Sequence, residues 1–164
     1  MWSRPEAFLR GCEQLGLRDP IDTLQALFTA FKALQAAVFG AWCVYFAART
    51  GQPNNWGTPA GALGVLLIAA GQALNVSAFV RLGRVGVFYG NRLGRETPWR
   101  DGFPFSWLAH PQYVGAATSI WGLFLLLRYP NEDWLFLPLL ETIYYGLAAH
   151  LERLPGPDAS ARSG

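Results

Sequence analysis

The chain has 164 residues, of which 52% are hydrophobic and only 15% are charged, and its formal net charge is +2. Soluble domains carry about 25% charged residues, and nucleic-acid-binding domains usually present a strongly basic face. The composition therefore indicates one domain of an integral membrane protein. It disfavours a soluble all-helical protein and gives no support to nucleic-acid binding.

The first predicted element is an amphipathic helix over residues 5–18, whose two faces differ in polarity. The apolar face holds Phe8, Leu9, Cys12 and Leu15, and the polar face holds Arg10, Glu13 and Gln14. This pattern is typical of a helix lying in the membrane interface and equally of a surface helix packed on the protein. The two cysteines, at positions 12 and 43, have no metal-binding or redox spacing.

Four apolar stretches follow, each predicted to be a transmembrane helix: residues 27–48, 59–80, 111–127 and 134–151. About 20 apolar residues are needed to cross the hydrocarbon of a bilayer, and the third stretch is somewhat short. The second is rich in small residues that allow close helix packing, namely Gly57, Gly61, Gly64 and Gly71. Residues 153–164 are rich in Pro, Gly, Ser and Ala and are predicted to be disordered. The predicted fold class is an all-α integral membrane bundle of about four transmembrane helices over residues 1–152, with an N-terminal interfacial helix.

Arginine is distributed unevenly between the predicted loops. The N-terminal arm, residues 81–110 and the C-terminal tail hold most of the arginines, whereas the two other loops offer only Arg49 and Arg128. With four spans, the three arginine-rich segments fall on one side, which the positive-inside rule makes cytoplasmic. The chain contains a single lysine, which points weakly to a GC-rich bacterial genome. The predicted location is the bacterial inner membrane, with both termini in the cytoplasm.

Two segments between the second and third spans are the strongest candidates for a binding site: LGRVGVFYGNRLG at 82–94 and GFPFSWLAHPQYVG at 102–115. The first contains no GxGxxG after a strand, so it does not indicate a Rossmann fold. Its glycines recur every three to four residues and on a helix would form a smooth face for another helix or a flat ligand: Gly83, Gly86, Gly90 and Gly94. Three arginines in it could bind anionic lipid headgroups: Arg84, Arg92 and Arg95.

Two further residues could take part in catalysis or ligand binding. His110 precedes Pro111, which suits the first turn of a helix, so the histidine is either a cap or interfacial residue or a cofactor contact and proton relay. Glu141 lies in mid-span, where a carboxylate facing lipid costs about 2.5–3.5 kcal/mol. It therefore faces the bundle or a water-filled cavity, or it is protonated. Its role is either to bond a structural partner or to form a site for a cation such as a sulfonium or an amine. The candidate partners are Lys32, Gln72 and Asn75.

Together these elements resemble the integral-membrane phospholipid methyltransferases, the phosphatidylethanolamine N-methyltransferase group, and more distantly the isoprenylcysteine carboxyl methyltransferases. The resemblance is best over residues 75–127 and continues weakly to Glu152. It rests on the Gly-rich segment followed by FPF and then HPQYVG. It implies methyl transfer from S-adenosylmethionine to phosphatidylethanolamine, or to its mono- and dimethyl derivatives, toward phosphatidylcholine at the cytoplasmic membrane face.

The resemblance also implies a methyl-donor site made by Gly83, Gly86, Gly90, Gly94, His110, Pro111, Tyr113, Gly115 and Glu152. The family carries a Glu-Glu pair after the last span, which here is reduced to Glu152, and Glu141 has no counterpart in the family pattern. We expect Glu141 or His110 to accept the proton that the amine loses. We expect Arg84, Arg92 or Arg95 to bind the phosphate of the lipid.

Two alternatives remain at this point. One is a methyltransferase that acts on a thiol or a prenylcysteine carboxylate and so needs no acceptor for an amine proton. The other is a small membrane transporter or scaffold without enzymatic activity, in which Glu141 and Lys32 form a buried ion pair.

Overall fold

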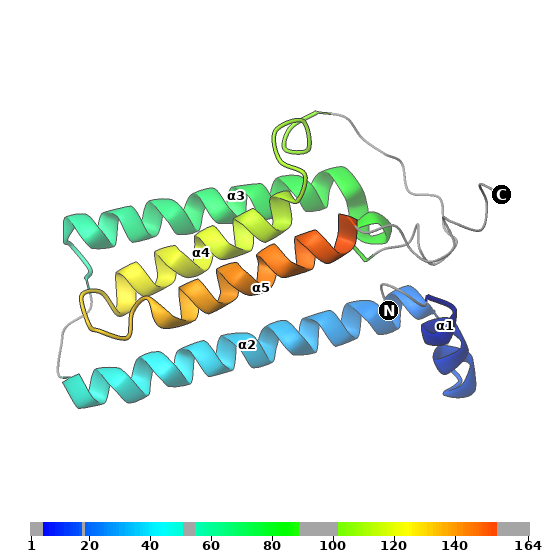
Figure 1. Ribbon diagram of the computed structural model, residues 1–164, viewed down its shortest axis with the longest axis horizontal. Coiled ribbons are helices and arrows are strands. Elements are labelled where there is room, and N and C mark those ends of the chain that lie inside the picture. The colour runs from blue at the N-terminus through cyan, green and yellow to red at the C-terminus, as the bar shows by residue number, and fades with distance from the viewer. Residues whose placement is uncertain (1–4, 18, 51–54, 89–101, 154–164) are drawn as a thin grey trace.

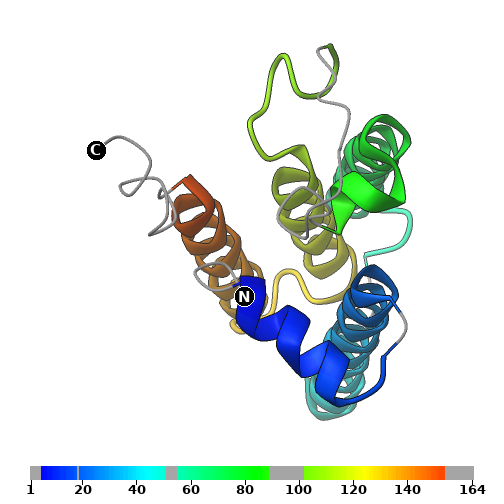
Figure 2. The same ribbon diagram turned by 90° about the vertical axis from the view of Figure 1, so that its right-hand side faces the viewer.

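The computed structural model of the chain describes residues 5–17, 19–50, 55–88 and 102–153, and within them every regular element is an α-helix (Figure 1). The helices are α1 (Pro5–Gln14), α2 (Pro20–Thr50), α3 (Pro59–Val87), α4 (Pro111–Leu127) and α5 (Phe136–Arg153). α2 to α5 run alternately in opposite directions, with α4 between α3 and α5, and α1 lies across one end of the bundle (Figure 2). The predicted all-α membrane bundle is confirmed, whereas the placement of α1 in the membrane interface stays a prediction.

Proline begins three of the four long helices, because its fixed φ suits the first helical position and its missing N–H costs nothing there. The preceding residues satisfy two of the free backbone donors. The backbone N–H of Ile21 donates to Asp19 Oδ1 at 2.8 Å, and that of Gly61 donates to Thr58 Oγ1 at 3.1 Å. The starts of α2 and α3 are thus fixed by local chemistry.

Glycines bring α3 and α4 into backbone contact. A Cβ atom added at Gly115 would lie 2.6 Å from the carbonyl oxygen of Gly71, and one added at Gly122 would lie 2.5 Å from that of Gly64. Small residues at such positions let helices pack closely inside a membrane. The predicted packing role is confirmed for the glycines within α3, whereas Gly57 lies in the preceding turn with φ +81° and open space around it.

α2 meets the rest of the bundle through long side chains. The rings of Phe39 and Phe124 pack edge to face with centroids 5.7 Å apart, and those of Trp42 and Phe136 stack at 5.8 Å. Phe39 and Phe124 belong to the buried core, together with Ile120, Leu137 and Tyr145.

Two helices, α2 and α3, are long and apolar enough to cross a membrane, and α4 is a shorter apolar helix of 17 residues. α4 has the predicted bounds, whereas α2 begins before the predicted span, at Pro20, and α3 continues beyond Val80 to Val87. α1, residues 102–110 and the end of α5 lie at one end of the bundle (Figure 1). The topology predicted from the arginine distribution requires these segments to lie on one side of the membrane. That this side is cytoplasmic stays a prediction.

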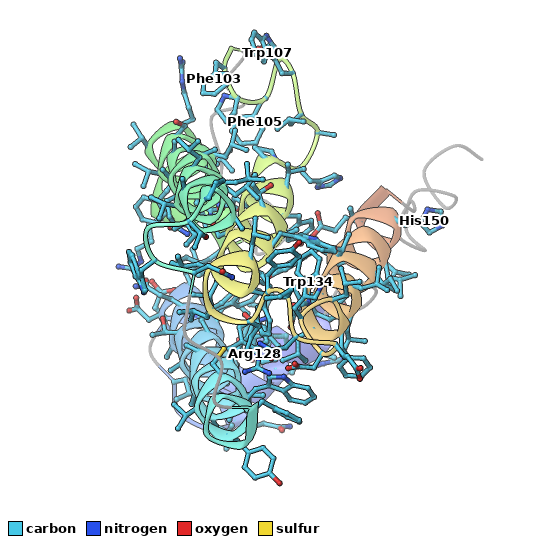
Figure 3. The ribbon with its side chains drawn as sticks, turned by 90° about the vertical axis from the view of Figure 1, so that its left-hand side faces the viewer. Phe103, Phe105, Trp107, Arg128, Trp134 and His150 are labelled. Carbon is cyan, nitrogen blue, oxygen red and sulfur yellow. The ribbon has the colours of Figure 1, made fainter. Side chains whose placement is uncertain are left out.

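The opposite end is held by a buried ion pair. Arg128, only 1% exposed, donates from Nη2 to Asp133 Oδ1 at 2.6 Å, and Trp42 Nε1 of α2 donates to Asp133 Oδ2 at 2.7 Å. Figure 3 shows Arg128 inside the outline of the bundle. Burial raises the pKa of the Asp133 carboxyl, but the hydrogen bonds from Arg128 and Trp42 outweigh burial and leave the pKa below its ordinary value. The α4–α5 turn is therefore joined to α2.

Candidate functional site

His110 and Glu152 meet at the end of the bundle that carries α1. His110 immediately precedes α4, and Glu152 lies in the last turn of α5. The His110 Nδ1 and Glu152 Oε2 atoms are 3.1 Å apart, and the two side chains are 22% and 13% exposed. Two helices thus bring an imidazole and a carboxylate together at a position that is shielded but still accessible.

Tyr113, one turn into α4, completes this group. Its hydroxyl donates to Glu152 Oε1, and its ring stacks on His110 with centroids 5.6 Å apart and an interplanar angle of 11°. Both Glu152 oxygens are therefore engaged, one by each aromatic side chain. His110 occupies the N-cap position of α4, but its side chain makes no capping hydrogen bond to the helix and meets Glu152 instead.

A second polar group lies deeper in the bundle, next to the first. The Tyr113 ring packs against Tyr145 of α5 with centroids 5.5 Å apart. Lys32 of α2 donates to the Tyr145 hydroxyl and, at 2.8 Å, to Gln35 Oε1. The sequence did not indicate this link between α2 and α5, because contacts between distant helices leave no local pattern.

Glu141 keeps one oxygen free of partners within the part of the chain that the structure describes. Its Oε2 atom is buried and makes no hydrogen bond there. The candidate partners lie elsewhere: Lys32 bonds Tyr145, Gln72 donates to Ser119 Oγ at 2.9 Å, and Asn75 lies beside Gly115. The buried Glu141–Lys32 ion pair of the non-enzymatic alternative is replaced by the contact of Lys32 with Tyr145.

The predicted glycine face is interrupted. Gly83 has φ +63° and kinks α3, a conformation that glycine adopts readily. A Cβ at Gly83 would meet nothing within 4 Å, and the nearest atoms to one at Gly86 belong to Leu82. Gly115 lies buried in the α3–α4 contact, which accounts for a glycine there by packing alone. Two predicted positions, Gly90 and Gly94, lie outside the described residues.

Of the arginines predicted to bind phosphate, the structure describes one. Arg84 Nη2 forms an ion pair with Asp22 Oδ1 of α2, and the two side chains are 49% and 62% exposed. An exposed pair of this kind is weak, so Arg84 can exchange its partner for an anionic group. Arg92 and Arg95 lie outside the described ranges.

The chemistry available at this end of the bundle is that of a shielded carboxylate flanked by aromatic rings. Glu152 can accept hydrogen bonds from hydroxyl or ammonium groups, and the face of Tyr113 can attract a cation. Pro111 is buried at the start of α4 and fixes the position of His110 before it. Such a group suits a ligand that carries hydroxyls and a positive charge.

Comparison with known proteins agrees with this interpretation. A model of the phospholipid methyltransferase family matches residues 59–153, which is more than half of the chain and includes the whole of α3, α4 and α5. The chain belongs to the phospholipid methyltransferase family. Membership in this family implies a methyl donor and a lipid substrate in a membrane.

Within this family, the chain is similar to the phosphatidyl-N-methylethanolamine N-methyltransferase of Arabidopsis thaliana, with 37% identity over 97 residues. The matched region covers 59% of this chain and 56% of the plant protein, so the chain spans little more than half of that relative. No solved structure matches the chain. The family match begins at α3 and leaves α1 and α2 outside it.

Proposed function

We propose that this protein transfers the methyl group of S-adenosylmethionine to the amine nitrogen of phosphatidylethanolamine or of its mono- and dimethyl derivatives. The observation that carries the proposal is the convergence of His110, Tyr113 and Glu152 at one end of the bundle, within the region matched by the family. The Arabidopsis relative, named for methylating phosphatidyl-N-methylethanolamine, supports this acceptor class.

The residues at this end fit the methyl donor. S-adenosylmethionine, when bound, supplies an electrophilic methyl group on a positively charged sulfur. Glu152 would hold hydroxyl or ammonium groups of the donor, His110 would hold Glu152 in place, and the ring face of Tyr113 would favour the positive charge of the donor. Gly83, which has open space around it, and Gly86 would form part of the wall, together with the predicted Gly90 and Gly94. Gly115 would support this wall through its packing against α3.

The acceptor nitrogen must be uncharged when it forms the new C–N bond, as the bond between methyl and sulfur breaks. The amine arrives protonated, so one proton leaves for every methyl group transferred. Glu141 has a buried oxygen without a partner among the described residues and is proposed to accept this proton, with His110 as the other candidate acceptor. Holding the two reactants in line supplies several kcal/mol of the required barrier reduction.

The bilayer supplies the acceptor in this proposal. The long apolar helices α2 and α3 would let the lipid tails remain in the membrane while the headgroup enters the bundle. Arg84, released from Asp22, is proposed to hold the lipid phosphate, together with Arg92 and Arg95. The proposed location is a bacterial inner membrane, with this end of the bundle facing the cytoplasm.

The test is methyl transfer by the purified protein in lipid nanodiscs. Labelled S-adenosylmethionine is added to discs that contain phosphatidylethanolamine or its mono- or dimethyl derivative, and the products are identified by mass spectrometry. Parallel reactions offer a small thiol and a prenylated cysteine. Labelled phospholipid is the expected product, whereas label only on the thiol or the prenylcysteine would replace the proposed acceptor. If no labelled product forms and the donor does not bind, the result would favour a transporter or scaffold.

The two histidines of the chain provide a matched pair of variants. His110→Ala removes a contact of Glu152, and His150→Ala changes an exposed histidine on α5 that Figure 3 shows pointing away from the bundle. We expect His110→Ala to weaken donor binding about tenfold in calorimetry, the loss of roughly one charge-assisted hydrogen bond, and His150→Ala to leave it unchanged. Equal donor affinity in both variants would remove His110 from the site.

A further inference from the structure

An aromatic stack leads from the Glu152 carboxylate into the interior of the bundle. We use this term for the rings of His110, Tyr113 and Tyr145, whose neighbouring centroids are 5.6 and 5.5 Å apart. Tyr145 lies seven residues before Glu152 on α5, about 10 Å along the helix axis, and is only 7% exposed. The stack therefore joins the proposed donor end to the membrane-embedded interior.

The inner ring of the stack already carries an ammonium group. Lys32 Nζ lies 5.0 Å from the ring centroid of Tyr145 and also bonds its hydroxyl. The Lys32 side chain is exposed overall, so it can move away without disturbing the core. The hydroxyl end of Tyr145 thus binds a nitrogen cation, and its ring face, which can attract a cation, is not covered by Lys32.

Two buried polar atoms without partners lie on the helices that carry Tyr145 and Lys32. They are Glu141 Oε2, one turn from Tyr145 on α5, and Gln35 Nε2, one turn from Lys32 on α2; neither makes a hydrogen bond within the described part of the chain. Most buried polar side-chain atoms in proteins do have a partner. A carboxylate oxygen without one, a single turn from an ammonium-binding ring, favours an additional cation.

We propose that Tyr113 and Tyr145, with the Glu141 carboxylate, receive the amine nitrogen of the acceptor lipid, and that the ammonium of Lys32, bonded to the Tyr145 hydroxyl, competes with this nitrogen until the acceptor enters. This inference rests on the proposed function and deepens it by naming the acceptor side of the site. It also gives α2 a role, although α2 lies outside the family match.

Aromatic faces suit an acceptor whose methylation state changes. Each added methyl group replaces an N–H donor, so a site made only of hydrogen-bond acceptors would lose one contact per round. A ring face attracts the charge of an ammonium whether or not its hydrogens have been replaced, as aromatic sites for quaternary ammonium ligands show. The aromatic stack can therefore accept unmethylated, monomethyl and dimethyl nitrogen in turn.

Substitutions at Tyr145 test the ring directly. In nanodiscs, Tyr145→Leu should raise the KM for the dimethyl acceptor roughly 3- to 30-fold, while donor affinity, measured by calorimetry, stays the same. Tyr145→Phe keeps the ring and should not raise the KM, because it removes only the hydroxyl that holds Lys32. Tyr45→Leu is the matched control, because this tyrosine of α2 is 55% exposed. An unchanged KM in Tyr145→Leu, or a loss of donor affinity alone, overturns the proposal.

A second measurement needs neither turnover nor a folded Tyr145→Leu variant. Tetramethylammonium ion is titrated into the wild type and into Lys32→Met, and binding is followed by intrinsic fluorescence. Removing the competing ammonium should tighten binding about threefold or more. Equal binding by both proteins overturns the proposal. Tighter binding by Lys32→Met, combined with no methyl transfer by the wild type, supports this site and contradicts only the proposed function.

Discussion

At the scale of single residues, the site depends on carboxylates in two different environments. Glu152 is engaged through both oxygens by His110 and Tyr113 at the end of the bundle. Glu141 lies about three helical turns deeper and leaves a buried oxygen without a partner among the described residues. An engaged carboxylate is suited to fixing a ligand, whereas one with a free oxygen is suited to receiving a proton.

Glu141→Gln separates the catalytic interpretation of Glu141 from a structural one. We expect the variant to retain its fold and donor binding while its turnover falls about 100-fold, the usual contribution of a general base. The loss should be most severe at low pH, where free amine is scarce. Initial rates across a pH series, set beside the exposed control Glu132→Gln, give the measurement.

The opposite result has a clear signature. If Glu141 is structural, Glu141→Gln will lower the unfolding temperature and leave turnover per folded molecule intact. Such a result would remove Glu141 from the mechanism without affecting the methyltransferase assignment.

The sequence predicts the members of the site better than their contacts. Resemblance to the family placed His110, Tyr113 and Glu152 in one site, and the structure brings these three together. The donor role of that group stays a prediction. The position of Lys32 on Tyr145 could not be predicted, because it depends on how α2 packs against α5. From the sequence, Arg128 was counted only as a loop arginine, although its burial against Asp133 makes it part of the fold.

At the scale of elements, the bounds of α4 were predictable because Pro111 begins it and the polar run after Leu127 ends it. The kink of α3 at Gly83 was not predictable, because a glycine in a helix is equally compatible with a straight helix. The α4–α5 turn depends on tertiary contacts as well: Asp133 receives hydrogen bonds from Arg128 in the same turn and from Trp42 in α2.

Asp133→Asn should lower the free energy of unfolding by about 3–5 kcal/mol, because it leaves Arg128 buried without its counter-charge. The folded-state pKa of Asp133 lies below its ordinary value. The stabilisation is therefore complete above the unfolded pKa of about 3.9 and is lost as the pH falls through the lower, folded pKa. Thermal unfolding followed by tryptophan fluorescence between pH 7 and acid tests both statements.

The comparison with Glu132→Gln controls for the loss of a neighbouring exposed carboxylate. In this control the stability and its dependence on pH should match the wild type. If Asp133→Asn is equally stable at pH 7, or loses stability in acid as steeply as the wild type, the ion pair does not hold this end together.

Gly122→Ala tests the glycine contact between α3 and α4. The new Cβ would lie 2.5 Å from the Gly64 carbonyl oxygen, so the helices must separate, and overpacking of this kind costs about 1–3 kcal/mol. Gly146→Ala in α5 meets nothing within 4 Å and should instead stabilise its helix by about 0.5–1 kcal/mol. Unfolding in mixed micelles compares the two, and equal stability would show that the α3–α4 contact tolerates a larger side chain.

At the scale of the whole molecule, the two ends of the bundle have different roles. One end carries α1 and the group formed by His110, Tyr113 and Glu152, and the other is closed by the buried pair of Arg128 and Asp133. A cytoplasmic methyl donor could reach the first end only if that end faces the cytoplasm. The orientation of the bundle is therefore a requirement of the proposed function as well as an expectation from the arginine distribution.

Cysteine labelling determines this orientation. Two exposed tryptophans mark the two ends: Trp56, 62% exposed, precedes α3, and Trp107, 81% exposed, precedes α4 on the segment that projects beyond the helices (Figure 3). Each is replaced by cysteine in a protein whose native cysteines, Cys12 and Cys43, have been removed. A maleimide that cannot cross membranes should label Trp56→Cys in intact spheroplasts and Trp107→Cys only after the membrane is opened.

Labelling of both from the same side would contradict the four-span topology. The reverse pattern would keep four spans but place the His110 end away from the cytoplasmic methyl donor, and the proposed reaction could not occur there.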